Sequence, residues 1–313
     1  MQIHYSFDNI GKIANPVVTT GAFDGVHIGH KTIINRINFL AKQIEGESVL
    51  ITFFPHPRKV LFPNENKNLF FINSQREKIE LLGKTGLDHL FIITFTLEFA
   101  NTSSEDFVRK LLVEKLGAKI IVVGFNHHFG HNREGNYENL RKIGDELKFE
   151  VEEIPEQDIE HEAVSSTRIR KALIEGYIQR ANAYLDHQYI IIGNITSDKE
   201  RYCDFNLKIY NISIEEEEKL IPPAGIYATN IILGNQSFRA MAIVSKIGES
   251  DICSGRDSNV DINLIDTVDY SIEDELISVY FYKRITIGFS NNDRNKLKID
   301  ITSAKNLIEE LIY

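Results

Sequence analysis

The sequence predicts two folds in succession: a doubly wound α/β domain on a parallel sheet, then a smaller antiparallel β-barrel domain with a C-terminal helix. Up to about residue 186, short apolar runs alternate with amphipathic stretches, as strands and helices do around a parallel sheet. From about 187 to 290, apolar residues recur at period two, which favours antiparallel strands. The last stretch, TSAKNLIEELIY, has the apolar spacing of a helix. We therefore expect domains at 1–186 and 187–313.

The predicted strands of the first domain are short runs that are mostly apolar. Strands of this kind are buried on both faces, because helices cover both sides of a parallel sheet. The predicted strands lie at 16–20, 48–54, 88–94, 119–124 and 149–154.

The predicted helices between these strands carry apolar faces and end signals. Ser74 and Glu77 have the spacing of a capping box, in which each residue satisfies the other's backbone N–H. The apolar face of the first helix is formed by Ile33, Ile37, Leu40 and Ile44. The predicted helices lie at 29–44, 74–82, 103–117, 136–147 and 165–176.

Turn residues separate some of the period-two runs in the second half of the chain. PPAG at 222–225 and GNQS at 234–237 are typical of connections between antiparallel strands. Several short strands of this kind predict an antiparallel sheet closed into a small barrel.

The composition excludes several classes of protein. The net charge of the 313 residues is −10, so a general nucleic-acid or anionic-membrane surface is not expected. Cys203 and Cys253 are the only cysteines and have no CxxC spacing, which argues against a disulfide framework and a zinc site. No apolar run approaches the ~20 residues that span a bilayer, and the N-terminal residues lack a signal-peptide core. We expect a cytoplasmic protein with small-molecule partners.

The exit of the first long strand is rich in glycine and histidine. Gly21 permits a tight turn, while Gly25 and Gly29 allow the backbone to approach a ligand closely. A helix that begins near Gly29 directs free N–H groups and a positive dipole end at this place, which suits phosphate. His27 and His30 lie three residues apart across the helix start and can both face the same anion.

The alternative is a glycine turn with two surface histidines. The spacing FDGVHIGH at a strand exit favours the phosphate site over this alternative, because imidazoles at a helix start can stabilise charge that grows on a phosphate.

A second stretch, SSTRIRKALIEG, has similar chemistry. Three hydroxyl residues precede a helix, and one of them is expected to cap it while the others hold phosphate oxygens. Arg168 and Arg170 add fixed charge in a form suited to phosphate. Taken alone, this stretch favours an ordinary capped helix with solvated arginines, whereas its pairing with the first site favours phosphate binding. The hydroxyl residues are Ser165, Ser166 and Thr167.

Two further loops follow strand ends. ITFFPHPRKV leaves the second strand in a Pro-His-Pro turn. VVGFNHHFGHNREGN leaves the fourth strand, where Phe125, Asn126 and Phe129 suit a flat heteroaromatic ring with polar edges. The same loop holds three histidines, but no carboxylate or cysteine completes a metal-ligand set, so we favour an interpretation without metal. These histidines are His127, His128 and His131.

Four ordered motifs, GAFDGVHIGH, TFFPHP, VVGFNHHFGHNREGN and SSTRIR, resemble the prokaryotic bifunctional riboflavin kinase/FAD synthetase family. They are similar to its N-terminal FMN adenylyltransferase module, a Rossmann-like nucleotidyltransferase of the HxGH superfamily. The resemblance spans about residues 15–186.

The resemblance implies a role for each matching residue. It assigns His27 and His30 to the phosphates of ATP, and the SSTxxR positions, Arg170 included, to the other side of the triphosphate. It places Gly124 and Asn126 near the flavin. Its remaining nucleotide positions are Gly21, Phe23, Asp24, Gly25, Gly29, Ser165, Ser166, Thr167 and Arg168.

The implied reaction transfers AMP from Mg²⁺-ATP to FMN and releases FAD and pyrophosphate. The phosphate oxygen of FMN attacks the α-phosphorus, and no protein nucleophile is needed. Catalysis rests on positioning and charge stabilisation.

The second domain departs from the family pattern. The family's barrel phosphorylates riboflavin and carries a GxPTAN-type segment near its start. The corresponding region, 190–214, keeps Gly193 but has no such segment, whereas PPAGIYA resembles a family strand. Asp261 matches the family's proposed base and is shorter by one methylene; the alternative is a polar residue on the outer face of a strand. We expect weak or lost riboflavin kinase activity.

Other functions are compatible with the same motifs. An HxGH enzyme can modify another phosphorylated precursor, such as nicotinate mononucleotide or phosphopantetheine. The degenerate barrel also suggests a flavin-binding regulatory protein with reduced catalysis. A fragment of a class I aminoacyl-tRNA synthetase shares the HIGH-like signature, but this chain is short and acidic.

Overall fold

The structure is a computed structural model, and residue contacts divide the chain into two compact units. We call Met1–Leu69 with Lys78–Val164 the sheet unit, and Phe70–Glu77 with Ser165–Tyr313 the barrel unit. The predicted boundary near residue 186 remains a prediction; residues 165–186 group with the barrel by contacts. The structure describes all residues except 9, 65–68, 125–127, 132–133, 156–157, 160–161, 198–208, 247–257, 267–271, 288–293 and 312–313.

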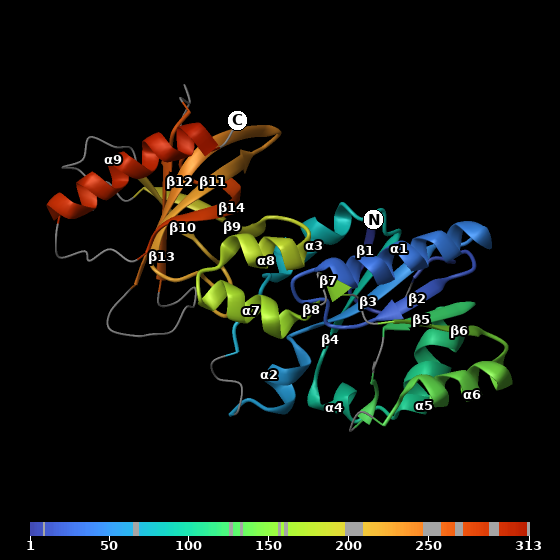
Figure 1. Cartoon of the computed structure of the whole chain (residues 1–313). Helices are drawn as coiled ribbons and strands as arrows, with labels where there is room; N and C mark the ends of the chain where they lie inside the picture. Colours follow the sequence, from blue (N-terminus) through green and yellow to red (C-terminus); the bar gives the residue numbers. More distant parts are fainter. Residues whose placement is uncertain are drawn as a thin grey trace. The chain divides into compact units, whose positions relative to one another are not determined.

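The sheet unit contains a six-stranded parallel sheet, which confirms the predicted doubly wound fold (Figure 1). The strand order is β1-β4-β3-β2-β5-β6, so the chain order reverses on the two sides of β2. Ligands of such folds bind outside the carboxyl ends of the strands at this switch point. The strands are β1 (Gln2–His4), β2 (Val17–Thr20), β3 (Ser48–Phe54), β4 (His89–Thr94), β5 (Ile120–Gly124) and β6 (Glu150–Ile154), with a small hairpin of β7 (Asp158–Ile159) and β8 (Glu162–Ala163).

Helices lie on both sides of this sheet. Helix α1 contacts β2, β3 and β5 on one side, while α5 and α6 lie on the other side in Figure 1. The buried face of α1 includes Ile37 and Leu40 as predicted, together with Ile34. The predicted Ile33 and Ile44 are half-buried. The helices are α1 (Ile28–Gln43), α2 (Pro57–Leu61), α3 (Gln75–Gly83), α4 (Leu97–Ala100), α5 (Ser104–Asp106) and α6 (Tyr137–Leu147).

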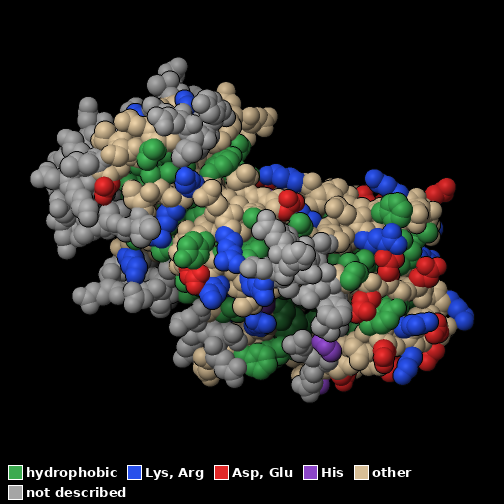
Figure 2. All heavy atoms as spheres, in the orientation of Figure 1, with side chains coloured by type: hydrophobic (Ala, Val, Ile, Leu, Met, Phe, Trp, Pro, Cys, Tyr) green, Lys and Arg blue, Asp and Glu red, His purple; other side chains and the backbone are tan. Residues whose placement is uncertain are grey.

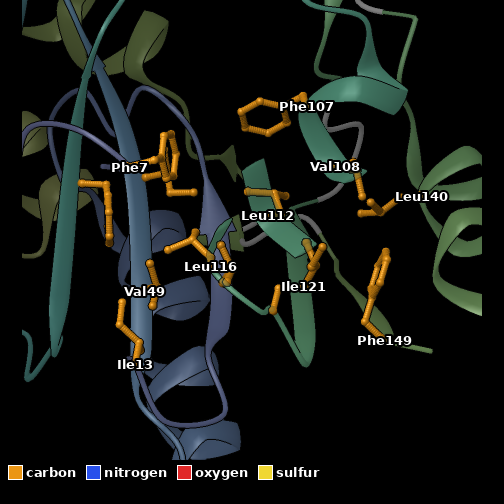
Figure 3. Packing of buried hydrophobic residues seen from close by; sticks show 14 of the residues in the cluster. Phe7, Ile13, Val49, Phe107, Val108, Leu112, Leu116, Ile121, Leu140 and Phe149 are labelled. Carbon is orange, nitrogen blue, oxygen red and sulfur yellow. The ribbon is translucent and has the colours of Figure 1, made fainter. Parts of the chain in front are cut away.

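One predicted helix, 103–117, departs from α geometry. After α5 the chain forms a π-helix, η1 (Phe107–Lys115), and its end is closed by the bond from Leu116 N–H to the carbonyl of Leu111, five residues back. Figure 3 shows the apolar side of η1, with Phe107, Val108 and Leu112, facing the sheet. Leu140 of α6 and Phe7 belong to the same cluster. This cluster packs η1 and α6 against the face of the sheet that lies opposite to α1.

The barrel unit contains a closed antiparallel barrel of six strands, as predicted. The C-terminal helix α9 packs Ile301, Ala304 and Ile308 into an apolar cluster with barrel residues that include Ile243. The strands are β9 (Tyr189–Ser197), β10 (Ile209–Ser213), β11 (Gly225–Leu233), β12 (Gln236–Lys246), β13 (Ser258–Leu264) and β14 (Leu276–Ile287), and the helices are α7 (Ser166–Ile174), α8 (Ile178–Leu185) and α9 (Arg294–Leu311).

A buried ion pair joins the segment Phe70–Glu77 to the barrel. Lys219 Nζ lies 2.6 Å from Glu77 Oε2, and both side chains are fully buried. The other carboxylate oxygen of Glu77 accepts a hydrogen bond from Ile192 N–H in β9. The predicted capping box is also present, because Ser74 N–H donates to Glu77 and Glu77 N–H donates to Ser74 Oγ. Glu77 therefore serves as both a helix cap residue and an anchor.

The surface carries both signs of charge. Figure 2 shows Lys and Arg side chains interspersed with Asp and Glu on the visible face. Across the described part of the chain, no helix is long and apolar enough to cross a membrane.

Candidate functional site

The turn after β2 has an unusual backbone. Gly21 N–H donates to the carbonyl of Ile51, which keeps the chain beside β3. Three residues then adopt positive φ: Phe23 (49°), Gly25 (95°) and Val26 (42°). Positive φ is costly for Phe and Val, and such residues concentrate where a ligand requires a fixed backbone. The turn is therefore a strained element held by its surroundings, at the switch point beside β5.

His27 and His30 meet at the end of this turn. His27 is the N-cap residue of α1 and is 7% exposed. The two imidazole rings stack with their centroids 3.6 Å apart, and the ring of Phe23 lies 4.7 Å from that of His30. The Nδ1 atom of His30 is buried and has no hydrogen-bond partner within the described residues. His27 is thus buried and His30 is half-buried, which argues against a glycine turn with two surface histidines.

The electrostatics of the pair favour an uncharged His30. Burial lowers the pKa of His30 well below 6.5, and the nearby charges of His27 and Lys78 lower it further. A neutral imidazole has one donor nitrogen and one acceptor nitrogen. At neutral pH the site therefore presents imidazole N–H groups beside the free N–H groups of the α1 N-terminus.

Lys78 of α3 is a residue that the sequence interpretation missed. Its Nζ donates a 2.9 Å hydrogen bond to the carbonyl of Ala22, inside the turn, and the side chain is 6% exposed. Glu77 and Lys78 precede Leu81 and Leu82 at helical spacing in the sequence, and the structure buries all four residues. Charged residues are rarely fully buried unless they are paired.

Three further residues predicted for the site are Asp24, Gly29 and Gly124. Asp24 is 3% exposed, so its carboxylate is buried in the turn. Gly29 lies in the first turn of α1. A Cβ added to Gly124, at the end of β5, would lie 3.1 Å from the Cδ1 of Ile33, so the glycine permits close packing of α1 on this strand.

Aromatic rings gather at the strand exits of the sheet unit. Phe53 of β3 lies 5.7 Å from Phe95 and 5.6 Å from Phe99, and Phe107 lies 6.2 Å from Phe99 and 6.3 Å from Phe129. These five rings form an aromatic wall, a name we keep below. Phe125, Asn126 and His127, which the sequence assigns to the same loop, lie outside the described residues.

The loop that carries Phe129 is docked on α5. Phe129 and Gly135 pair through two backbone hydrogen bonds, and Glu134 accepts a hydrogen bond from Ser104 N–H. His131 Nδ1 lies 3.3 Å from the carbonyl of Ala100, and His128 is exposed. In the described part of the chain, no three His, Cys, Asp or Glu residues gather in a way that would hold a metal ion.

The second predicted phosphate site lies at the start of α7, in the barrel unit. Ser165 is the N-cap residue, since its Oγ accepts a hydrogen bond from Arg168 N–H. Thr167 and Arg168 are exposed, whereas Ser166 and Arg170 are half-buried. The structure thus identifies Ser165 as the capping hydroxyl of α7.

Asp261 of β13 is fully buried and accepts a 2.8 Å hydrogen bond from Asn211 Nδ2. In the strand register it lies opposite Ile243, a member of the cluster that α9 joins. It is therefore not a solvated residue. Most of the region that corresponds to the family's GxPTAN segment, 198–208, lies outside the described residues.

Comparisons with known proteins agree with the two folds. A family model described as FAD synthetase matches residues 11–168, and one described as riboflavin kinase matches residues 185–312. The bifunctional riboflavin kinase/FMN adenylyltransferase of Listeria monocytogenes is 32% identical over 230 residues, which cover 74% of this chain and 72% of the relative.

Two further matches span nearly the whole chain. The protein of the same description from Buchnera aphidicola subsp. Schizaphis graminum is 28% identical and covers 99% of this chain and 98% of its own. A crystal structure described as a macrolide-efflux protein from Streptococcus pneumoniae has a TM-score of 0.84 at 25% identity and covers 98% of this chain. The chain therefore belongs to the bifunctional riboflavin kinase/FMN adenylyltransferase family of enzymes.

Proposed function

We propose that His27 and His30 bind the phosphates of ATP while the sheet unit transfers AMP to FMN. The observation that carries this proposal is the ring stack of the buried His27 and the half-buried His30 at the switch point. The Nδ1 atom of His30 is buried and has no hydrogen-bond partner among the described residues. A buried polar atom without a partner costs free energy, so a site that retains one has a ligand to receive.

The reaction balances without a covalent enzyme intermediate. An oxygen of the FMN phosphate forms a bond to the α-phosphorus of ATP, and the bond from this phosphorus to the bridging oxygen breaks. The electron pair leaves on pyrophosphate. Negative charge grows on the phosphate oxygens, and imidazole N–H groups together with the α1 N-terminus stabilise it through fixed dipoles.

The start of α7 supports a second phosphate-binding role within the barrel unit. Arg168 is exposed and Arg170 is half-buried, both in the first half of α7, and Ser166 and Thr167 precede them. The guanidinium fork and the hydroxyls suit phosphate oxygens. Ser165 contributes indirectly, because it holds the helix start.

The aromatic wall supports flavin binding in the sheet unit. Four of its rings are half-buried and suit the face of a flat isoalloxazine: Phe53, Phe95, Phe99 and Phe129. Gly124 lies at the end of β5, the strand that precedes the loop of Phe129. Phe54 and Phe62 add exposed apolar surface at the end of β3 and after α2. We include Asn126 in this site on the strength of the sequence motif alone.

Mg²⁺ enters this proposal as part of the ATP substrate. The described residues offer no cluster of ligands for it. Mg²⁺ usually keeps several waters and binds through one or two carboxylates and the substrate phosphates, which is consistent with arrival on ATP.

The barrel is proposed to have weak riboflavin kinase activity. The GxPTAN-type segment is missing from the sequence. Asp261, the candidate base, is fully buried and already bonded to Asn211. A base must reach the hydroxyl that it deprotonates, and a shorter, enclosed carboxylate is poorly placed for this.

One assay tests both parts. Purified protein is incubated with Mg²⁺-ATP and either FMN or riboflavin, and the flavins are separated by chromatography. We expect FAD from FMN and little FMN from riboflavin; absence of FAD contradicts the main proposal, and rapid FMN formation contradicts the weak kinase. His30→Ala should lower kcat for FAD formation by about 100-fold or more. His187→Ala is the matched control, because this histidine lies in the barrel unit, where its Nδ1 is 2.8 Å from the carbonyl of Gln188.

A further inference from the structure

A buried ammonium group lies against the strained turn that carries the histidines. The Nζ atom of Lys78 donates to the carbonyl of Ala22, between Gly21 and Phe23. Removing an ammonium from water costs several kcal/mol unless other interactions offset the loss. A buried lysine at this position therefore needs an explanation.

Two donors converge on the same carbonyl. Thr52 Oγ1 of β3 donates to Ala22 at 3.2 Å, and Lys78 donates at 2.9 Å. Together they fix the direction of the peptide that precedes Phe23, where the run of positive φ begins. Strained backbone persists only where its surroundings over-determine it, and these two bonds do so here.

The two donors differ in charge. The hydroxyl of Thr52 is neutral, whereas the ammonium of Lys78 places a positive charge close enough to His30 to act on its titration. Among the described residues, His27 and Lys78 are the titratable groups that act on His30, and the buried Asp24 belongs to the same turn. A fixed cation near a neutral imidazole strengthens the local field that an incoming phosphate meets, and needs no rearrangement when the phosphate arrives.

We propose that Lys78 is a positioning residue of the phosphate site: it fixes the turn through the Ala22 carbonyl and supplies a fixed positive charge near His30. This inference rests on the proposed role of His27 and His30 as phosphate ligands. The competing explanation is that Lys78 only braces α3 against the end of β2, as an uncharged donor would.

Three variants separate charge from bracing. Lys78→Met removes the donor and the charge, Lys78→Gln keeps an N–H donor without charge, and Thr52→Val removes the other donor to the same carbonyl. Each is assayed for FAD formation over a range of ATP and FMN concentrations, and the pKa of His30 is followed by NMR of histidine-labelled full-length protein. Circular dichroism verifies folding.

We expect both lysine variants to lower kcat/KM for ATP by about 100-fold, with KM for FMN within about twofold of the parent. Thr52→Val should lower kcat/KM for ATP by less than about tenfold, because only a neutral hydrogen bond is lost. The pKa of His30 should rise in the two lysine variants and stay constant in Thr52→Val. If Lys78→Met fails to fold, Lys78→Gln carries the test.

The inference is overturned if Lys78→Gln retains the kcat/KM for ATP and the His30 pKa of the parent. His30→Ala shows which idea has failed. If His30→Ala abolishes FAD formation while Lys78→Gln leaves kcat/KM for ATP and the pKa of His30 unchanged, only the proposed role of Lys78 is wrong. If His30→Ala retains full activity, the phosphate role of the histidines is wrong and the inference falls with it.

Discussion

The rings of His27 and His30 stack with their centroids 3.6 Å apart and their planes 18° from parallel. Two protonated rings at this distance would repel each other, and partial burial would strengthen the repulsion. The stack therefore disfavours the doubly charged state and suits a site whose imidazoles act as hydrogen-bond donors.

This geometry predicts the titration of His30. Because burial, then His27 and Lys78, lower its pKa, His30 should remain neutral well below pH 6.5 in the folded protein. The unfolded chain binds this proton at higher pH, so His30 costs no stability above about pH 6.5, and stability falls as pH drops below it. NMR titration of the imidazole measures the pKa directly. His27→Gln should raise the pKa only in part, because burial is the largest cause; titration near 6.5 in the parent would contradict the prediction.

Loss of the ion pair between Lys219 and Glu77 should strongly lower the stability of the barrel unit. Both side chains are fully buried, and the carboxylate also receives Ser74 N–H and Ile192 N–H. Lys219→Met leaves the charge of Glu77 buried without its partner. The free energy of opening of this region should therefore fall by about 3–5 kcal/mol. Hydrogen exchange of peptides that cover β9 measures the opening free energy.

A double substitution serves as the control. Adding Glu77→Gln to Lys219→Met removes the remaining charge while it keeps an oxygen acceptor, so part of the lost protection should return. Additive losses in the double variant would show that the two residues act independently and would refute the ion-pair argument.

Most of the fold follows from local pattern. The apolar runs place β2 to β6, and period two places the barrel strands, because burial on two faces or one leaves a different periodicity. Successive side chains on a helix point about 100° apart, so Ile34 lies on the face of Ile37 and Ala41, while Ile33 lies at its edge and is half-buried. The π-helix of η1 and the short edge strand β1 leave no comparable signal in the sequence.

The candidate site was predictable only where its residues are adjacent in the chain. His27 and His30 follow from spacing, but Lys78 is brought to Ala22 by the packing of α3. The same holds for Lys219, which finds Glu77 across 142 positions. Long-range partners of charged residues are set by tertiary packing, which no local pattern contains.

Ser165 gives a prediction about α7. Its Oγ accepts Arg168 N–H, so Ser165→Ala should cost about 1 kcal/mol of helix stability, and Ser165→Gly only a few tenths. The measurement is hydrogen exchange of the first turn of α7 in both variants. Ser166→Ala, which removes a hydroxyl that does not cap the helix, should leave this exchange unchanged. Equal effects of alanine at 165 and 166 would show that the cap is not at Ser165.

Substitution of Gly130 tests whether the position of the loop that carries Phe129 controls flavin binding at the aromatic wall. A Cβ at this position would lie 2.5 Å from both Cα and N of Ser104, and its φ of +75° already disfavours other residues. Gly130→Ala must therefore shift the loop that carries Phe129, and displacement of about 1 Å at a binding site costs up to about 100-fold. Gly117→Ala is the matched control: its φ is +73°, but nothing lies within 4 Å of the added Cβ. Both variants should lose about 1–2 kcal/mol through strain, while only Gly130→Ala should raise KM for FMN. A KM for FMN that rises equally in both variants would show that backbone strain, rather than contact with Ser104, controls the wall.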